Sequence, residues 1–311
     1  MITDKDQVAY FNFLCKTYDG LTRVITATKN RIQSLNPEMN ADNYWILNGM
    51  VENKPGTSIK YQGLESIKGQ VSRRIEKELG FWPVWSNWME HIPGIGPFIA
   101  GNLILKYYYA FIPVCKDCGT VLEKKDKTFW CSECQKSVKG EGNLQHKLTI
   151  KDFPMISSWW HYMGRHNVAH CPTCRKILTN NTCPKCGKII ENPIYLMPKR
   201  QSGTQSDWST PGRTLGFMIR EAFNMFSEDH FYKSYQVKEK AKYAKRHPDW
   251  TKGHCHNVAW NNTVKLFLSH FWQVARTLDG LSVTEPYIVA KDPVHKIIPP
   301  FYWEGEGRKA A

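Results

Sequence analysis

Four Cys-x-x-Cys pairs constrain this chain more than any other feature of its sequence. They hold eight of its ten cysteines, namely Cys115, Cys118, Cys131, Cys134, Cys171, Cys174, Cys183 and Cys186. Twelve residues separate the first two pairs and eight separate the last two. Two such pairs supply the four thiolates of a tetrahedral structural zinc site. We therefore expect two four-cysteine zinc ribbons and two structural Zn²⁺ ions.

Neither metal is expected to be catalytic, because four thiolates leave no open coordination position. A redox role is disfavoured, since the pairs come two by two at ribbon spacing. A reducing compartment fits this cysteine pattern better than disulfide bonds do. With each shell complete, four nearby histidines are expected to be ordinary polar or phosphate-contacting residues: His146, His161, His166 and His170.

Positive charge gathers around the predicted ribbons. The chain has a formal net charge of +14, and residues 110–190 hold 13 Lys and Arg against 6 Asp and Glu, a surplus of +7. Such a surface attracts polyanions such as DNA or RNA. General solubility, anionic lipid and an acidic protein remain alternatives. A hydrophobic content of 41% is sufficient for a packed core and argues against disorder.

The sequence also bears on the compartment. No apolar run of 18 residues occurs, and the first seven residues carry acids where a signal peptide carries basic residues. We therefore expect a cytoplasmic protein without a membrane partner.

The N-terminal region is expected to form a helical arm. Residues 7–35 carry a heptad stripe typical of a coiled-coil seam or of a buried helix: Phe11, Leu14, Tyr18, Leu21, Ile25, Thr28, Ile32 and Leu35. Residues 38–62 are expected to be irregular, with a turn at Pro55-Gly56. A second helix is predicted from Leu64 to Leu79 and ends near Gly80. The two helices would form an antiparallel pair or a homodimerisation arm.

The segment IPGIGPFIAGNL, residues 92–103, fits a helix-hairpin-helix pattern. Gly94 and Gly96 would allow a tight turn, so that backbone amides at the start of the second helix face a phosphate oxygen. The alternative is a hairpin used only for packing.

Four further segments complete the chain. Trp159, Trp160 and Tyr162 lie between the ribbons beside Arg165, and could stack on bases or enter the core. Residues 196–211 are expected to form a polar loop, and a helix with Arg213 and Arg220 follows. A basic helix containing Lys242 and Lys245 is either a solvated face or a phosphate-backbone contact. An amphipathic helix then ends at Gly280.

The expected fold is mainly α: a helical domain with a helix-hairpin-helix, a coiled-coil-like N-terminal arm and two small four-cysteine zinc ribbons. The expected segments are the arm (1–80), the helix-hairpin-helix (81–110), the first ribbon (111–150), the aromatic segment with the second ribbon (151–195), a helical domain with a serine loop (196–290) and a tail (291–311).

The order of these segments resembles the C-terminal transposase domain of the DEDD-type insertion-sequence transposases, which are guided by a bridge RNA. The resemblance covers about residues 60–290, with the zinc ribbons as insertions. It rests on IPGIGPFIA, on PKRQSG (residues 198–203) and on PGRTLGFMIR (residues 211–220). The last helix is similar to the family's final helix at His256, Ala259, Lys265, Trp272, Ala275 and Arg276.

The resemblance implies that Ser202 is the strand-transfer nucleophile, beside Arg200, Gln201 and Gly203. It also implies a RuvC-like half with four acidic metal ligands. Only about 60 residues precede the second arm helix, and Asp4, Asp6 and Asp19 make no metal constellation there. We therefore expect a partner protein to supply that half.

Three functions remain open. The chain could bind DNA or structured RNA without catalysis, through Gly94, Gly96, Arg165, the loop residues, Arg213, Arg220, Lys242 and Lys245. It could be a recombinase in which Ser202 attacks a phosphodiester and arginines stabilise the transition state. It could also be a scaffold that dimerises through its first helix. We favour binding.

Overall fold

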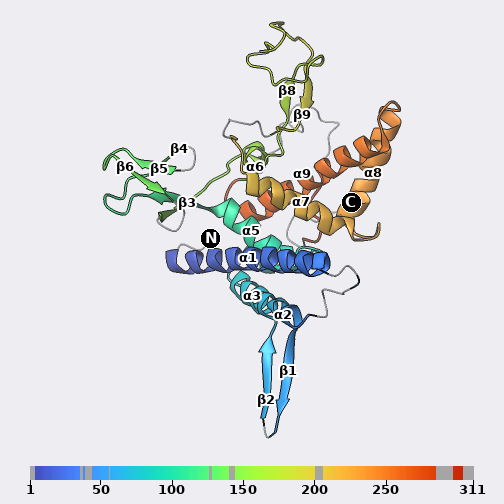
Figure 1. The fold of residues 1–311 in the computed structure, drawn as a ribbon. Coiled ribbons are helices and arrows are strands. Elements are labelled where there is room, and N and C mark those ends of the chain that lie inside the picture. The colour runs from blue at the N-terminus through green and yellow to red at the C-terminus, as the bar shows by residue number, and fades with distance from the viewer. Residues whose placement is uncertain are drawn as a thin grey trace. The chain divides into compact units, whose positions relative to one another are not determined.

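The computed structural model describes residues 4–35, 38, 44–55, 57–125, 128–139, 144–199, 206–284 and 297–303. This part of the chain contains nine α-helices and nine β-strands, and about half of it is helical (Figure 1). The strands form one three-stranded and three two-stranded sheets. Two compact units divide the chain. Unit 1 comprises residues 1–82 and 100–152, and unit 2 comprises residues 83–99 and 153–311.

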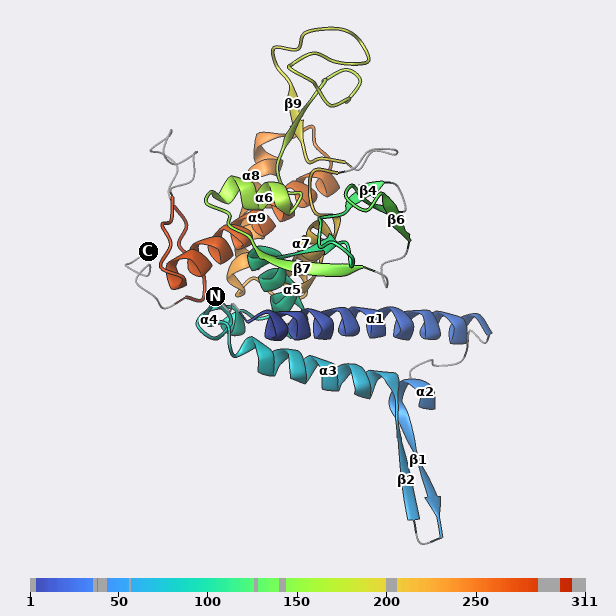
Figure 2. The same ribbon diagram turned by 90° about the vertical axis from the view of Figure 1, so that its left-hand side faces the viewer.

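Unit 1 is built on two long helices. Helix α1 (Lys5–Leu35) lies alongside α3 (Leu64–Leu79) in antiparallel fashion (Figures 1 and 2). Phe11, Leu14, Ile25 and Ile32 of the heptad stripe are buried within the unit, whereas Leu35 is 86% exposed. The stripe therefore packs mainly inside one chain, as in the antiparallel-pair alternative. Dimerisation through α1 stays a prediction.

The expectation of an irregular segment over residues 38–62 is wrong for most of its described part. Helix α2 (Trp45–Asn48) is followed by a hairpin of β1 (Gly49–Lys54) and β2 (Thr57–Gln62), paired from Gly49↔Gln62 to Lys54↔Thr57. Most of its side chains are exposed, so the sequence lacks the apolar alternation of a half-buried strand. The hairpin extends away from the two helices (Figure 2).

In this unit a helix is followed directly by a strand of a two-stranded sheet. Helix α5 (Pro97–Tyr108) continues into β3 (Tyr109–Val114), which pairs antiparallel with β7 (Gln145–Ile150). The chain between β3 and β7 forms the three-stranded sheet β4 (Glu123–Lys125), β5 (Thr128–Cys131) and β6 (Lys136–Lys139). The first cysteine group is thus inserted at the end of a two-stranded stem.

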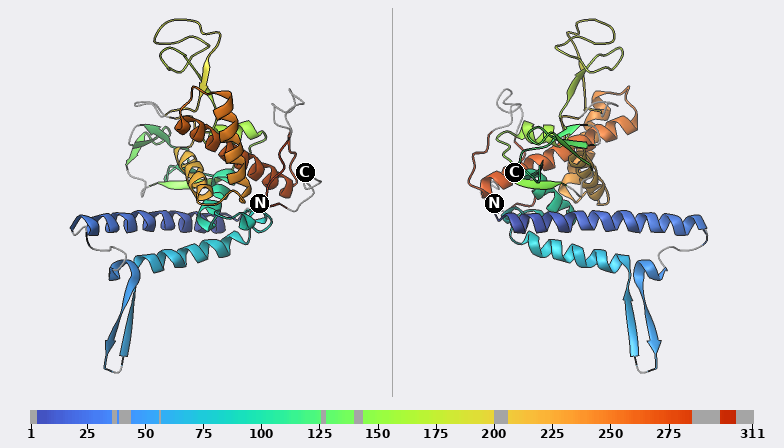
Figure 3. Two further views of the ribbon diagram at one scale, coloured as in Figure 1. Left: turned by 90° about the vertical axis from the view of Figure 1, so that its right-hand side faces the viewer. Right: turned by 60° about the vertical axis from the view of Figure 1, so that its left-hand side comes forward.

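Unit 2 is organised around α9 (Lys252–Leu278). Phe267, Leu268 and Phe271 of this helix are fully buried. Four helices pack against it: α4 (Pro83–Ser86), α6 (Ile156–Tyr162), α7 (Thr210–Asn224) and α8 (Phe231–Arg246). The strands β8 (Val168–His170) and β9 (Ile194–Leu196) form a second stem, from which the second cysteine group extends (Figure 3).

Residues 297–303 contribute to the core of unit 2. The Nε1 of Trp88 donates a hydrogen bond to the carbonyl of Phe301 at 2.7 Å. His270 Nε2 lies 3.0 Å from the carbonyl of Ile298, and His270 Nδ1 lies 2.9 Å from the hydroxyl of Tyr232. Burial lowers the pKa of His270 to about 3, so the ring is neutral. Since a carbonyl only accepts, Nε2 carries the proton and Nδ1 accepts from Tyr232.

Two glycines offer a test of packing in unit 1. A Cβ atom at Gly101 would lie 2.9 Å from Cys15 Sγ and 3.1 Å from Phe11, whereas a Cβ at Gly20 meets nothing within 4 Å. We expect Gly101→Val to lower the free energy of unfolding by about 1–3 kcal/mol through overpacking. Gly20→Val should change it by less than about 0.5 kcal/mol. Equilibrium urea unfolding measures both, and equal effects would contradict this packing.

Candidate metal centres and anion-binding site

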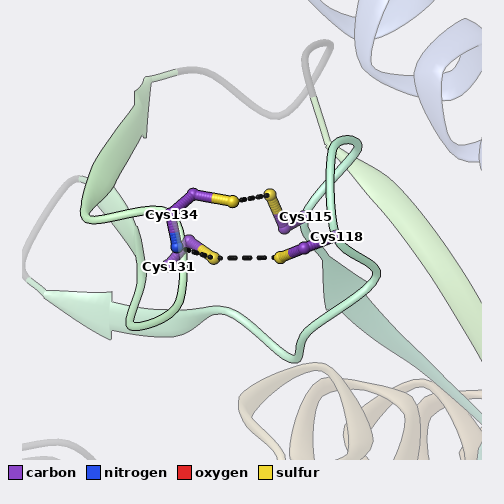
Figure 4. A group of neighbouring side chains, drawn as sticks. All are labelled: Cys115, Cys118, Cys131 and Cys134. Atoms are coloured by element: carbon purple, nitrogen blue, oxygen red, sulfur yellow. Dashed lines mark hydrogen bonds between the residues drawn. The ribbon is translucent and has the colours of Figure 1, made fainter.

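The first cysteine group gathers four sulfur atoms around one point. Cys115 and Cys118 come from the turn after β3, Cys131 ends β5, and Cys134 lies in the turn between β5 and β6 (Figure 4). Cys115 Sγ lies 3.8 Å from Cys134 Sγ, and Cys118 Sγ lies 3.5 Å from Cys131 Sγ. Sulfur atoms about 2.3 Å from a tetrahedral zinc ion are about 3.8 Å apart. The group is therefore positioned to hold a metal ion.

The second group repeats this arrangement beyond β8. Four of its sulfur–sulfur distances run from 3.1 Å, between Cys183 and Cys186, to 3.7 Å, between Cys171 and Cys186. All four sulfur atoms lie within 4.8 Å of one another. Both predicted four-cysteine groups are thus present, each at the end of a two-stranded stem.

The four knuckles share one backbone device. The residue after the second cysteine of each pair has a positive φ: Gly119 (74°), Gln135 (52°), Arg175 (55°) and Gly187 (67°). This left-handed residue reverses the chain, so that both sulfur atoms of a pair face the same centre. Glycine occupies this position in two of the turns, and Gln135 and Arg175 occupy it in the other two.

The neighbouring sulfur atoms perturb one another strongly. The pKa of Cys134 is raised to about 12, chiefly by its hydrogen bond with the side chain of Cys118. The pKa of Cys186 is likewise raised to about 12, chiefly by its hydrogen bond with the side chain of Cys183. Four adjacent thiolates repel one another, whereas a divalent cation at their centre would stabilise all four. Both groups therefore suit a structural metal ion better than free thiols.

Arg165 occupies an unusual place in unit 2. It is only 6% exposed and lies against Gly216 of α7, where a Cβ atom would come within 2.5 Å of its Nη2. The guanidinium donates to the carbonyl of Arg213 at 3.3 Å and to Oδ1 of Asn261 at 3.4 Å. Its Nε has no hydrogen-bond partner among the described residues. Burial, followed by the charges of Arg213 and Arg220, lowers its pKa to about 10.

Arg213 and Arg220 lie two turns apart on α7. Ser209 caps the N-terminus of this helix, and its hydroxyl accepts a hydrogen bond from the amide of Gly212. The guanidinium of Arg213 lies 5.0 Å from the centre of the Trp208 ring and donates to the carbonyl of Pro198.

Arg220 donates to Oδ1 of Asn257 at 3.1 Å, and its Nε lies 3.3 Å from Glu221 without hydrogen-bond geometry. The structure thus brings Arg165, Arg213 and Arg220 together as an arginine cluster. Only Arg220 has a carboxylate partner among the described residues.

The remaining predicted binding residues are more scattered. Arg200, Gln201, Ser202 and Gly203 lie outside the described residues. Arg213 contacts Pro198 and Trp208, which flank that segment in the sequence. On α8, Lys242 and Lys245 are exposed, and Lys242 pairs with Glu239 at 3.0 Å.

The glycine turn before α5 serves packing at one of its two positions. Gly94 has a φ of +88°, and a Cβ there would lie 2.8 Å from the ring of Phe226. A Cβ at Gly96 would meet nothing within 4 Å. The turn is preceded by the short 3₁₀ helix η2 (Met89–His91). A phosphate-binding helix-hairpin-helix stays a prediction.

Several other candidate residues belong to the core. Trp159 is fully buried, and the half-buried Trp160 donates to the carbonyl of Lys265 at 3.2 Å. In the last helix, Trp272 and Arg276 both donate to the carbonyl of Phe153, at 2.7 and 3.1 Å. These side chains stabilise unit 2.

A third group of potential ligands was missed by the sequence reasoning. His161, His166 and Asp207 place one ligand atom each within 4.8 Å of one another. Burial is the largest cause that lowers the pKa of His166. The sequence predicts ordinary polar or phosphate-contacting histidines, because four cysteines complete each ribbon site, and Asp207 is too distant in sequence for a spacing motif. His166 and Asp207 also line a cavity of about 690 Å³ with Lys176, Lys185 and Lys199.

Comparisons with protein-family models, curated proteins and solved structures find no match to this chain. Within the described residues, no helix is both long and apolar enough to cross a membrane.

Metal content tests the two four-cysteine centres separately. Cys131→Ser and Cys183→Ser should each lower the zinc content by one ion per chain, because each removes a ligand from a different closed shell. Cys255→Ser, which alters a buried cysteine outside both groups, should leave the content unchanged. Mass-spectrometric metal analysis of purified protein measures this. An unchanged zinc content in either ligand variant would contradict that site.

Proposed function

We propose that this chain binds DNA or structured RNA by its phosphate backbone, and that it derives from a transposase-like domain. The observation that carries the proposal is the arginine cluster. Arg165 is 6% exposed and has no carboxylate partner among the described residues. A buried cation without a counter-charge is unfavourable, and an anion at the cluster would remove that penalty.

The chemistry of the cluster favours phosphate. A guanidinium offers planar paired donors that match two phosphate oxygens, and it keeps its charge at neutral pH. The pKa of Arg165, about 10, still lies well above neutrality. Successive phosphates of a nucleic acid would supply several anions to neighbouring arginines.

Further surfaces support the same proposal. Lys242 and Lys245 are exposed on α8, and exposed lysines also occur in the second cysteine module at Lys176, Lys185 and Lys188. Amides at the turn formed by Gly94 and Gly96 are a further proposed phosphate contact. DNA and RNA share this backbone chemistry, so the proposal covers both.

The transposase-like origin rests on the sequence resemblance. The segments that carry the resemblance include the glycine turn before α5, the PKRQSG loop, α7 with Arg213 and Arg220, and α9. Arg213 and Arg220 gather with Arg165, which fits a domain built to face phosphates.

A second candidate function is strand transfer by Ser202. It is favoured by Arg213, which contacts Pro198 before the loop and Trp208 after it. In this reaction the Ser202 oxygen attacks phosphorus and forms a phosphoserine bond. The bond to the leaving sugar oxygen breaks, and the serine proton passes to a base. A partner protein would supply the acidic metal ligands.

The binding proposal predicts a steep dependence on salt. Affinity for a labelled DNA duplex or RNA hairpin should fall at least tenfold between about 50 and 200 mM salt, because phosphate contacts release counterions. Combining Arg213→Gln with Arg220→Gln should weaken binding and reduce the slope of log K against log salt by about 1–2.

Arg23→Gln is the matched control, since it removes a guanidinium that is 79% exposed on α1 and paired with Asp19. Fluorescence anisotropy measures binding by the wild type, the double variant and this control. A flat salt response, or equal losses in the control and the double variant, would contradict backbone recognition by the cluster.

Catalysis predicts a covalent protein–DNA adduct. Incubation with end-labelled DNA and Mg²⁺ or Mn²⁺ should yield a complex that survives denaturation in the wild type and in Ser206→Ala. Ser202→Ala should abolish it, because the nucleophilic oxygen is gone. Denaturing gel electrophoresis detects the adduct. Absence of an adduct under every metal condition would exclude strand transfer by the isolated chain and leave the binding proposal intact.

A further inference from the structure

We propose that His161, His166 and Asp207 form a third metal site, of open coordination, for a divalent transition-metal ion of the zinc class. Two imidazoles and one carboxylate are a ligand set that holds zinc with a position left for an exogenous ligand. This site differs in kind from the two four-cysteine groups. It goes beyond the proposed nucleic-acid binding and does not depend on it.

The geometry requires little adjustment. His161 Nε2 lies 3.2 Å from Oδ2 of Asp207, and the two imidazole rings lie 4.0 Å apart at 17°. All three ligand atoms lie within 4.8 Å. Ligand atoms about 2.0–2.2 Å from one ion lie about 3–4 Å apart. The side chain of Asp207 is 69% exposed, so it is free to rotate the remaining distance.

The three residues come together where the turn after α6 packs against residues 208–209. His161 lies in the last turn of α6, and the chain then reverses at Gly164, which has a φ of +62°. A Cβ atom at Gly164 would lie 2.9 Å from the Trp208 ring. The residue after Trp208, Ser209, donates its amide to the carbonyl of Tyr162 at 2.8 Å. The contact that fixes this turn therefore also places Asp207 beside both histidines.

An unsatisfied polar atom supports a ligand at this point. The Nδ1 of His166 is buried and has no hydrogen-bond partner among the described residues. Buried polar atoms are satisfied in more than about nine cases of ten, so an exception needs an explanation. A metal ion near His161 and Asp207 would coordinate the imidazole of His166 and provide one.

The surroundings indicate what would complete the coordination shell. Two neutral imidazoles and one carboxylate leave a bound Zn²⁺ with a net charge of +1. The adjoining cavity is also lined by Lys176, Lys185 and Lys199. A positive centre with three nearby ammonium groups favours an anionic exogenous ligand, such as a phosphate oxygen. The competing interpretation is an ion pair between protonated His161 and Asp207, without metal.

Metal content of the full chain separates these interpretations. Protein saturated with Zn²⁺ and then freed of excess ion should hold three ions in the wild type and two in Asp207→Asn. Because the Asp207 side chain is exposed, Asp207→Asn should keep the native fold, which far-UV circular dichroism checks. His166→Ala should give the same loss, and His146→Ala, an exposed histidine on β7, should keep all three ions.

Cobalt provides an independent readout. Co²⁺ in the four-cysteine groups gives intense thiolate-to-metal charge transfer, which a histidine and carboxylate site lacks. Asp207→Asn should therefore remove one Co²⁺ per chain and leave the charge-transfer band unchanged. The proposal is overturned if the wild type and Asp207→Asn bind equal numbers of ions, or if the lost ion carries the thiolate band. Because no nucleic acid is present, this outcome is distinct from a failure of backbone binding.

Discussion

The burial of the Arg165 guanidinium is the constraint on which the candidate anion site depends. The side chain fits against α7 because Gly216 has no Cβ atom in its path. Its donors reach the carbonyl of Arg213 and the side chain of Asn261, both of which are neutral acceptors. Neutral acceptors satisfy donors but do not offset a charge. The positive charge therefore remains in the core of unit 2, beside Arg213 and Arg220. An anion that binds here would be attracted more strongly than by exposed arginines, because the low-dielectric surroundings screen the electrostatic interaction less.

The two cysteine modules depend on a different interaction. Each module is a short segment between the two strands of a stem, and segments of this size bury little apolar surface. In the first module, the buried cluster consists of Cys115, Leu122 and Cys131, so two of its three buried residues belong to the four-cysteine group that is positioned to hold a metal ion. The free energy of binding a metal ion there would substitute for a hydrophobic core. The stems β3–β7 and β8–β9 allow such modules to interrupt the chain without disturbing the helices on either side.

The sequence was informative where structure is set locally. The cysteine spacing defines a knuckle within four residues. The regular spacing of apolar residues in α1, α3 and α9 predicts that each helix buries one face. The hairpin β1–β2 was missed because its exposed strands carry no apolar alternation.

Two other features depend on residues far apart in the chain. Ile298 and Phe301 accept hydrogen bonds from His270 and Trp88, and no local signal marks such pairs. Asp207 likewise joins His161 and His166 across some forty residues of sequence. Gly94 shows a subtler limit. The sequence predicts a tight turn there, and the residue has a φ of +88°, but a local pattern does not reveal that Phe226 covers it.

Metal loading also changes the electrostatic argument for a polyanionic partner. The formal charge of +14, and the surplus of +7 in residues 110–190, both count cysteine as neutral. One Zn²⁺ held by four thiolates carries a net charge of −2, and both groups lie within that region. Loading both groups therefore lowers +14 to +10 and +7 to +3.

With both ions bound, the two cysteine modules would therefore attract phosphate less strongly than their lysines suggest. In the proposed binding, more of the attraction would then come from the arginine cluster and α8. A third ion at His161, His166 and Asp207 would act in the opposite direction. It would add two positive charges beside the cavity lysines. Of the three candidate metal centres in the described residues, it is also the one with a coordination position left for an anion.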